Sequence, residues 1–190
     1  MKKLFFALLS IINFHSVYAR PQEPYTPIVA INYANSWTDN LITLRNPAFI
    51  SFSNDCTNYL SQVLRAGGWR NTSIGSSTSD QYWYYVSGSQ YSQTWSVANA
   101  LFRRFNFGYE SWYGGQVWNP TTITARSGDV IFADWTGDGI IDHSMVVASG
   151  GSYATITLDY HSTDRKNFLF STVRSWYPNA VFYKFSPSSF

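Results

Sequence analysis

Cysteine is almost absent from this chain of 190 residues, which contains one, Cys56. A chain with a single cysteine cannot form an internal disulfide, so disulfide-stabilised scaffolds are excluded. Free cysteine is among the residue types that are most often buried, and an inert place in the core is the simplest interpretation of Cys56. The alternative is a thiol nucleophile, and the neighbouring residues must decide between the two.

Charged residues are also scarce, at 13% of the chain, and the formal net charge is +2. Lys2 and Lys3 account for this excess, because 11 of the 13 basic residues remain without them, against 11 acidic ones. A near-neutral chain lacks the basic face that nucleic-acid binding requires. Beyond the N-terminus no apolar run is long enough to cross a bilayer. We therefore expect neither a nucleic-acid partner nor a membrane span.

The first 19 residues have the pattern of a secretory signal peptide. Lys2 and Lys3 precede a mainly apolar run over 4–14, and the run ends in Val17-Tyr18-Ala19, which suits a signal peptidase. The run is shorter than the roughly 20 apolar residues of a membrane span, which disfavours an N-terminal anchor. We therefore predict a mature domain over 20–190 that is secreted or periplasmic.

Aromatic residues are abundant where charge is sparse, with 8 Trp, 14 Tyr and 14 Phe. Some must build the core, and others are expected to line a groove in which flat rings stack on sugar or peptide. Trp83 and Trp135 are the candidate substrate-binding rings. Asp55 and Asp142 are candidate polar contacts to substrate, although for Asp55 an interaction with a helix N-terminus is favoured.

The chain changes its periodicity half-way, from helical spacing to short strands. Helices are expected over 28–41, from Cys56 to a Gly67-Gly68 stop, and over 96–105 with Ser96 as cap. Strands are expected over 129–135, 143–148, 154–160, 173–176 and 180–185. Helices first and antiparallel strands second predict an α+β fold, with the Cys56 helix packed on the sheet.

Segment 71–94 fits neither class. It is too polar for a core and too aromatic for a disordered linker. We interpret it as a partly ordered loop bordering the site, with a surface insertion as the alternative.

Cys56 is predicted to lie in the first turn of its helix, because Ser53 and Asn54 just before it are good N-cap residues. At that position the helix dipole lowers the pKa of a thiol. Free backbone N–H groups there can also hold an oxyanion. The sequence thus favours a working thiol over an inert one.

A thiol nucleophile needs a base within reach, and histidine is the obvious candidate. His15 falls in the signal peptide, which leaves His143 and His161. The first opens a predicted strand and the second ends the next one, so antiparallel pairing brings both imidazoles to one end of the sheet. A cysteine on a helix N-terminus, a base and a second polar residue form a papain-like constellation.

Three blocks of this sequence are similar to the signature of the putative amidase domain family, a branch of the NlpC-type papain-like cysteine hydrolases. They are 55–62 with 66–68, 128–132 with Trp135 and 137–143, and 160–164; Tyr33, Ala34, Trp37, Asn46 and Pro47 resemble the family's first helix and loop. The resemblance implies a papain-like (NlpC-type) fold. It implies Cys56 as nucleophile, His143 as base and His161 as the orienting third residue. It also implies cleavage of amide bonds, with bacterial cell-wall peptides (the peptide part of peptidoglycan) as substrate.

Several alternatives stay open. Asp159 competes with His161 for the third role, because residues two apart on a strand share a face. Residues 134–142 resemble part of a calcium loop, but Thr136 and Met145 stand where ligands are needed, so a turn between strands is favoured. No metal or organic cofactor is needed. A transpeptidase or transamidase on the same triad and a non-catalytic wall-binding module are the rival functions, and an immunity or inhibitor partner is undetermined.

Overall fold

The computed structural model describes residues 25–41, 43–109, 112–117 and 119–187. The predicted signal peptide lies outside these residues. Within them, no helix combines the length and apolar character needed to cross a membrane. Helices and antiparallel strands are both present, so the predicted α+β class is confirmed.

The main sheet has six strands, in the order β3-β10-β5-β6-β8-β9, and every neighbouring pair is antiparallel. The bounds are β3 Trp112–Gln116, β5 Val130–Asp134, β6 His143–Ser149, β8 Thr157–Tyr160, β9 Arg165–Leu169 and β10 Val181–Pro187. Two small pairs lie apart from it: β1 Tyr85–Ser87 with β2 Gln90–Tyr91, and β4 Thr124–Ala125 with β7 Gly151–Ser152. Strands β5, β6, β8 and β10 match predicted strands, whereas β3 and β9 were not predicted.

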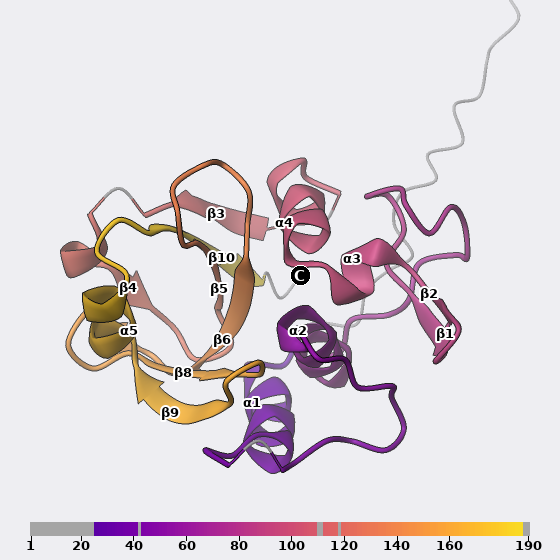
Figure 1. Ribbon diagram of the computed structural model, residues 1–190, viewed down its shortest axis with the longest axis horizontal. Helices are drawn as coiled ribbons and strands as arrows, with labels where there is room; N and C mark the ends of the chain where they lie inside the picture. Colours follow the sequence, from indigo (N-terminus) through magenta and orange to yellow (C-terminus); the bar gives the residue numbers. More distant parts are fainter. Residues whose placement is uncertain (1–24, 42, 110–111, 118, 188–190) are drawn as a thin grey trace, which may run out of the picture.

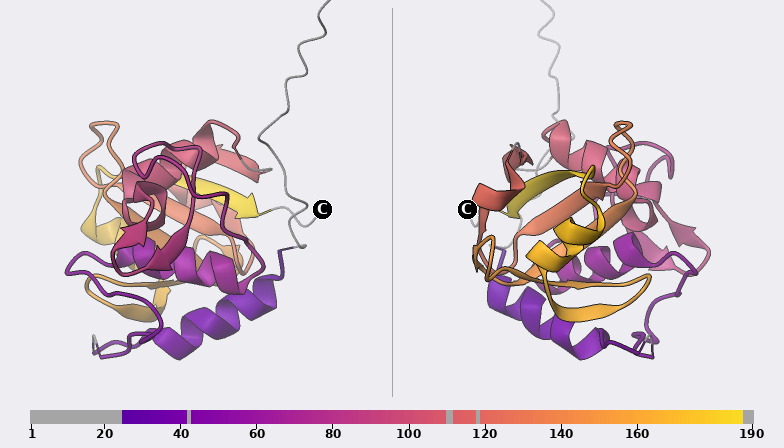
Figure 2. Two further views of the ribbon diagram at one scale, coloured as in Figure 1. Left: turned by 90° about the vertical axis from the view of Figure 1, so that its right-hand side faces the viewer. Right: turned by 60° about the vertical axis from the view of Figure 1, so that its left-hand side comes forward.

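Helices cover both faces of this sheet. On one face lie α1 Pro27–Trp37, α2 Cys56–Ala66, α3 Gln93–Ser96 and α4 Ala98–Asn106. The other face curves around α5 Phe170–Trp176 (Figure 1). Figure 2 shows α1 alongside α2 from two further directions. The Cys56 helix therefore packs on the sheet, as predicted.

Strand alternation divides the core between the two faces. Val130, Phe132 and Val146 point toward α2, while Ile131 and Met145 point toward α5. Both sets are fully buried, which explains why β5 and β6 are continuous apolar runs rather than alternating ones.

One predicted strand is a helix. Residues 173–176 belong to α5, because Phe170 and Val173, three positions apart, both point into the concave side of the sheet. The β-branched and aromatic composition that suggested a strand reflects burial instead. A seven-residue stretch with two core residues at helical spacing is too short to show helical periodicity in the sequence.

Two helix ends also differ from the prediction. The first helix ends at Trp37 rather than 41, where Thr38 turns to extended backbone and is buried. The expected 96–105 helix corresponds to α4, which Val97 precedes, while Ser96 is the last residue of the short helix α3. The Gly67-Gly68 stop after α2 is confirmed, and Gly68 adopts a left-handed φ of 117° that favours glycine.

Segment 71–94 contributes the buried rings of Trp83 and Tyr85 to the core, so the judgement that it is too polar for a core was wrong. Trp83 is 1% exposed, and it packs edge-on against Trp69 and tilted against Trp95. Tyr85 and Phe49 extend this cluster. The Ser- and Gly-rich residues between these rings form turns at the surface, which allows a polar segment to contribute large buried side chains.

Candidate active site

Cys56 is the first residue of α2, and its thiol is buried. The Sγ atom lies 3.7 Å from Asn54 Oδ1 and 3.6 Å from the hydroxyl of Thr57. That hydroxyl is 3.1 Å from the hydroxyl of Ser144 on β6. The predicted position in the first turn is confirmed, although the residue at the N-cap is Asp55 and not Ser53 or Asn54.

The surroundings of the thiol lower its pKa from 9.0 to about 7. Burial acts in the opposite direction and is the largest single influence. It is outweighed by the charge and hydrogen bond of His143, together with hydrogen bonds from the Thr57 side chain and the Ser144 backbone. A thiol whose pKa lies near 7 is partly thiolate at neutral pH, which is the nucleophilic form.

His143 opens β6 and is buried beside Cys56. Its ring lies between two aromatic rings, with centroids 5.5 Å from Trp135 and 5.0 Å from Tyr160. Within the described part of the chain, its Nε2 atom is buried without a hydrogen-bond partner. The structure therefore brings together the predicted nucleophile and base, and the base is flanked by rings rather than by a polar residue.

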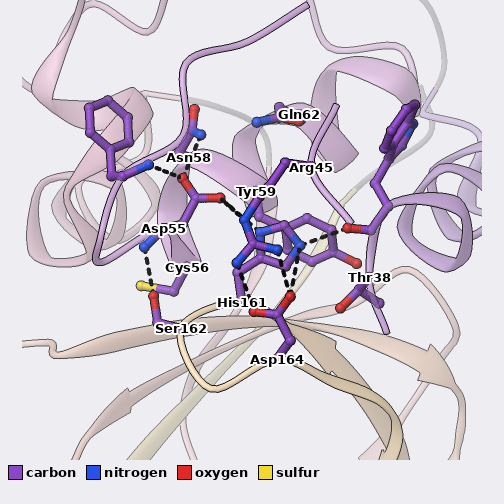
Figure 3. Close-up of polar contacts among 12 residues, drawn as sticks. Thr38, Arg45, Asp55, Cys56, Asn58, Tyr59, Gln62, His161, Ser162 and Asp164 are labelled. Carbon is purple, nitrogen blue, oxygen red and sulfur yellow. Dashed lines mark hydrogen bonds and ion pairs between the residues drawn. The ribbon is translucent and has the colours of Figure 1, made fainter. Parts of the chain in front are cut away.

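His161 does not orient His143, which corrects the role implied by the resemblance. Its Nδ1 atom lies 2.8 Å from Asp55 Oδ2, and its Nε2 atom lies 2.7 Å from the backbone oxygen of Trp37 (Figure 3). Both ring nitrogens are thus engaged elsewhere. The ring stacks on Tyr59 at a centroid distance of 3.9 Å, underneath the start of α2.

Asp159 does not take the third role either. It pairs with Val146 in the sheet, so its side chain shares the face of Val146 and not that of His143, three positions away. One of its oxygens accepts a hydrogen bond from Asn167 N, and the carboxyl group is completely buried. Burial raises the pKa of Asp159 from 3.8 to about 6.

The four predicted substrate contacts form two pairs, one buried and one beside His143. Asp55 is buried, and both of its oxygens accept hydrogen bonds from protein groups, so its side chain has no free acceptor for substrate. Trp83 lies in the core and donates its Nε1–H to Ser61, so it presents no face to substrate. The Trp83 prediction was wrong, because a sequence does not reveal that a polar loop folds back into the core. Nor does a sequence reveal that the Asp55 carboxylate is occupied by His161, 106 positions away.

The other two predicted contacts lie beside His143. Trp135 is half-buried and stacks on Tyr177 at 4.2 Å, next to the His143 ring. Asp142 is exposed, and its carboxylate accepts a hydrogen bond from Trp135 N, which holds the turn before β6 closed. Their proximity to the base is compatible with substrate contact, and that role stays a prediction.

The possible calcium loop is a turn joining β5 and β6. The Asp134 carboxylate accepts hydrogen bonds from the backbone N–H groups of residues 136–139. A carboxylate satisfied in this way is a turn cap. In the described ranges no group of three or more His, Cys, Asp or Glu residues is placed to hold a metal ion.

Arg45 is a member of the site region that sequence reasoning missed. It lies in a loop, yet its guanidinium reaches the buried Asp164 with two hydrogen bonds of 2.6 and 3.0 Å. Asp164 belongs to the third block of the resemblance, but no role was assigned to it. An arginine in a loop without local pattern carries no sequence signal of this pairing, which joins residues 119 positions apart.

Comparisons with known proteins identify the family of the chain. The family model described as "Putative amidase domain" matches residues 24–185. "Uncharacterized protein YhbB" of Bacillus subtilis (strain 168) is 30% identical over 125 residues, which is 66% of this chain and 37% of that protein. The chain therefore matches little more than a third of that relative's length, and no solved structure matches it significantly. With nearly all of its described residues inside the match, this chain belongs to the putative amidase domain family, for which hydrolysis of amide bonds is the indicated reaction.

Proposed function

We propose that this protein is a cysteine amidase with a papain-like (NlpC-type) arrangement, in which Cys56 is the nucleophile and His143 the base. One observation carries the proposal. The only cysteine of the chain starts a helix beside a histidine that, with neighbouring hydrogen bonds, lowers the pKa of its thiol to about 7. An inert buried cysteine would have a raised pKa instead.

The reaction begins when the Cys56 thiolate attacks the carbonyl carbon of an amide and its electron pair moves onto the carbonyl oxygen. The α2 N-terminus is suited to hold that oxyanion, because Asp55 makes no side-chain cap to its N–H groups. His143, carrying the proton of the thiol, protonates the leaving amine as the C–N bond breaks. Water, deprotonated by His143, then hydrolyses the thioester and restores the thiol.

The orientation of the base is supported by ring packing. His143 is flanked by Trp135 and Tyr160, and these contacts limit rotation of its ring. We assign to these two residues the orienting role that the resemblance implied for His161.

The proposed substrate is the peptide part of bacterial peptidoglycan, met outside the cell or in the periplasm. The proposal is supported by the signal-peptide pattern of 1–19 and by the resemblance to NlpC-type hydrolases. The half-buried Trp135 next to the base is suited to pack against a sugar or peptide face.

The test is mass spectrometry of purified peptidoglycan fragments incubated with the mature protein. New amine and carboxylate ends at one type of amide bond support the proposal, and a Cys56→Ala variant that folds should release none. Fragments joined to an added amine acceptor would identify a transamidase. Cleavage that survives in Cys56→Ala would refute the cysteine mechanism.

A further inference from the structure

Asp55 stands at the N-cap of the nucleophile helix without capping it. An aspartate at this position commonly accepts a hydrogen bond from an N–H group of the first turn. Here Oδ1 instead accepts from Phe52 N at 2.9 Å and from the Asn58 side chain at 2.8 Å. Oδ2 is directed to His161 (Figure 3). The carboxylate therefore contacts groups outside the helix backbone and leaves the N–H groups of the first turn without a side-chain cap.

Both ring nitrogens of His161 face an oxygen atom. A carboxylate oxygen faces one ring nitrogen and a peptide oxygen faces the other, at 2.8 and 2.7 Å. Both oxygens are suited to accept a hydrogen bond, and an imidazolium, which donates from both ring nitrogens, would satisfy both contacts. The ring is buried, and Tyr59 covers one of its faces.

A second ion pair completes the arrangement. Arg45 binds Asp164 with two hydrogen bonds, and its Nε atom lies 3.6 Å from Asp55 Oδ2. Asp164 is also 3.9 Å from His161 Nε2. With His161 as an imidazolium, two cations would face two buried carboxylates, and the opposite charges would balance. Arg45 is the one member with a substantially exposed side chain, at 25%.

Ser162 links the same two segments through the backbone. Its hydroxyl accepts a hydrogen bond from Asp55 N at 2.6 Å and donates one to Asn54 Oδ1 at 3.0 Å. Ser162 and Thr163 have left-handed φ angles of 64° and 73°, which are uncommon for residues with a side chain. This turn brings the Ser162 hydroxyl to the two residues that immediately precede the nucleophile.

We propose that His161, as an imidazolium, and Arg45 are positioning residues that hold the Asp55 carboxylate away from the backbone N–H groups of the first turn of α2 and thereby fix Cys56 against His143. The inference rests on the proposed function and assigns His161 to the nucleophile rather than to the base. Released from His161, Asp55 would be free to cap α2, so its carboxylate would occupy the N–H groups proposed to hold the oxyanion.

The first test measures the charge of His161 in the unmodified protein. Nitrogen NMR of the folded protein at pH 7, with ¹⁵N-labelled histidine, should show a ring with two protonated nitrogens that is distinct from His143, and His161→Gln should remove that signal. A neutral His161, with one unprotonated nitrogen, would overturn the proposal. This measurement needs no substrate and no folded variant for its main result.

The second test compares two variants that each lose an ion pair. His161→Gln removes the charge and one of the two hydrogen bonds. Asp80→Asn removes the carboxylate from the Arg103–Asp80 pair, whose hydrogen bonds of 2.7 and 2.9 Å lie outside the network. The readouts are kcat, KM and the pH midpoint of iodoacetamide labelling of Cys56, each on protein that shows a cooperative melt.

His161→Gln should lower kcat by about tenfold to a hundredfold, the range seen when a supporting contact of an active-site group is lost, with KM nearly unchanged. The labelling midpoint should move to higher pH. Asp80→Asn should change neither kcat nor the labelling midpoint. If His161→Gln keeps the wild-type kcat and midpoint, or if Asp80→Asn changes both by the same amounts, the positioning role is wrong. Amidase activity in Cys56→Ala would refute the proposed function instead, and would leave the NMR result standing.

Discussion

The Cys56 thiol is under two opposing influences. Burial destabilises the thiolate, while His143 and neighbouring hydrogen bonds stabilise it, and the net pKa of about 7 means that the second influence prevails. His143 supplies the largest of the lowering contributions. The pKa of this thiol therefore depends on His143 more than on any other side chain.

Iodoacetamide should label Cys56 at pH 6 about tenfold faster than a model thiol. Two pKa units increase the thiolate about a hundredfold, and the lower intrinsic nucleophilicity of a weaker base offsets about tenfold of this gain. The rate should rise with a midpoint near pH 7, the pKa of the thiol. His143→Ala should shift the midpoint upward, because burial then acts with less opposition. A thiol that is inert at pH 6 in the folded protein would contradict this picture.

The effects of losing Cys56 and His143 on turnover should not be additive. Cys56→Ala and His143→Ala should each remove nearly all release of peptidoglycan fragments, and the double variant should be little worse than either, since residues that act in one step are not additive. The measurement is the initial rate for each variant with a cooperative melt. Additive losses would indicate that the two residues act independently.

Among the elements, segment 71–94 is the one whose role changed most between prediction and structure. Its rings pack under α2 and carry a buried hydrogen bond from Trp83 to Ser61. The connection before β6 has the opposite character, because Trp135 is half-buried beside His143. Two tryptophans that looked equivalent in the sequence thus have different surroundings: Trp83 lies in the core, and Trp135 lies next to His143.

A pair of Trp→Phe substitutions separates these roles. Trp83→Phe leaves the buried Ser61 hydroxyl without its donor, so it should lower the free energy of unfolding by about 1–3 kcal/mol, with KM unchanged. Trp135→Phe should alter kcat/KM more than the melting temperature. Chemical denaturation and steady-state kinetics on both proteins check this. A raised KM in Trp83→Phe would restore the substrate role that the structure denies it.

For the molecule as a whole, the buried Asp159 couples folding to pH. Its pKa is raised from 3.8 to about 6, so between these values the folded state binds more protons than the unfolded state. Stability from this group is therefore fully present below about pH 4 and is lost as the pH rises through 6.

Relative to Asp159→Asn, the wild-type protein should lose about 2–3 kcal/mol of unfolding free energy between pH 4 and pH 7, because one pKa unit corresponds to about 1.4 kcal/mol. The measurement is denaturant unfolding of both proteins across this range. The variant should also retain its turnover, since Asp159 lies on the face of the sheet away from His143. A difference in stability that does not vary with pH would refute the assignment.

The signal-peptide prediction also concerns the whole chain. We expect the exported protein to begin at or near Arg20, after the Val17-Tyr18-Ala19 sequence. N-terminal sequencing of protein collected outside the cytoplasm measures this directly. Recovery of the exported chain with Met1 still present would show that 1–19 is not removed.

The order of the residues was sufficient to predict those features that depend on local chemistry. A cap followed by helical spacing and a glycine stop predicted α2, and the apolar runs predicted β5 and β6. Antiparallel succession of two strands placed His143 and His161 at one end of the sheet. Each of these inferences uses neighbours within a few positions, where backbone geometry limits the possibilities.

The partner of each polar group was decided by folding, because it depends on residues that approach from distant parts of the chain. His161 is engaged by Asp55, 106 positions away, and by the end of α1, so the motif identified the residue and not its contact. Arg45 and Ser162 also bind residues that are distant in the sequence, Asp164 and Asp55. Short turns allow the polar segment 71–94 to bury its aromatic rings. Residues 170–176 form a helix in which Phe170 and Val173 both pack into the core. Burial and pairing are properties of the packed arrangement, which no local pattern encodes.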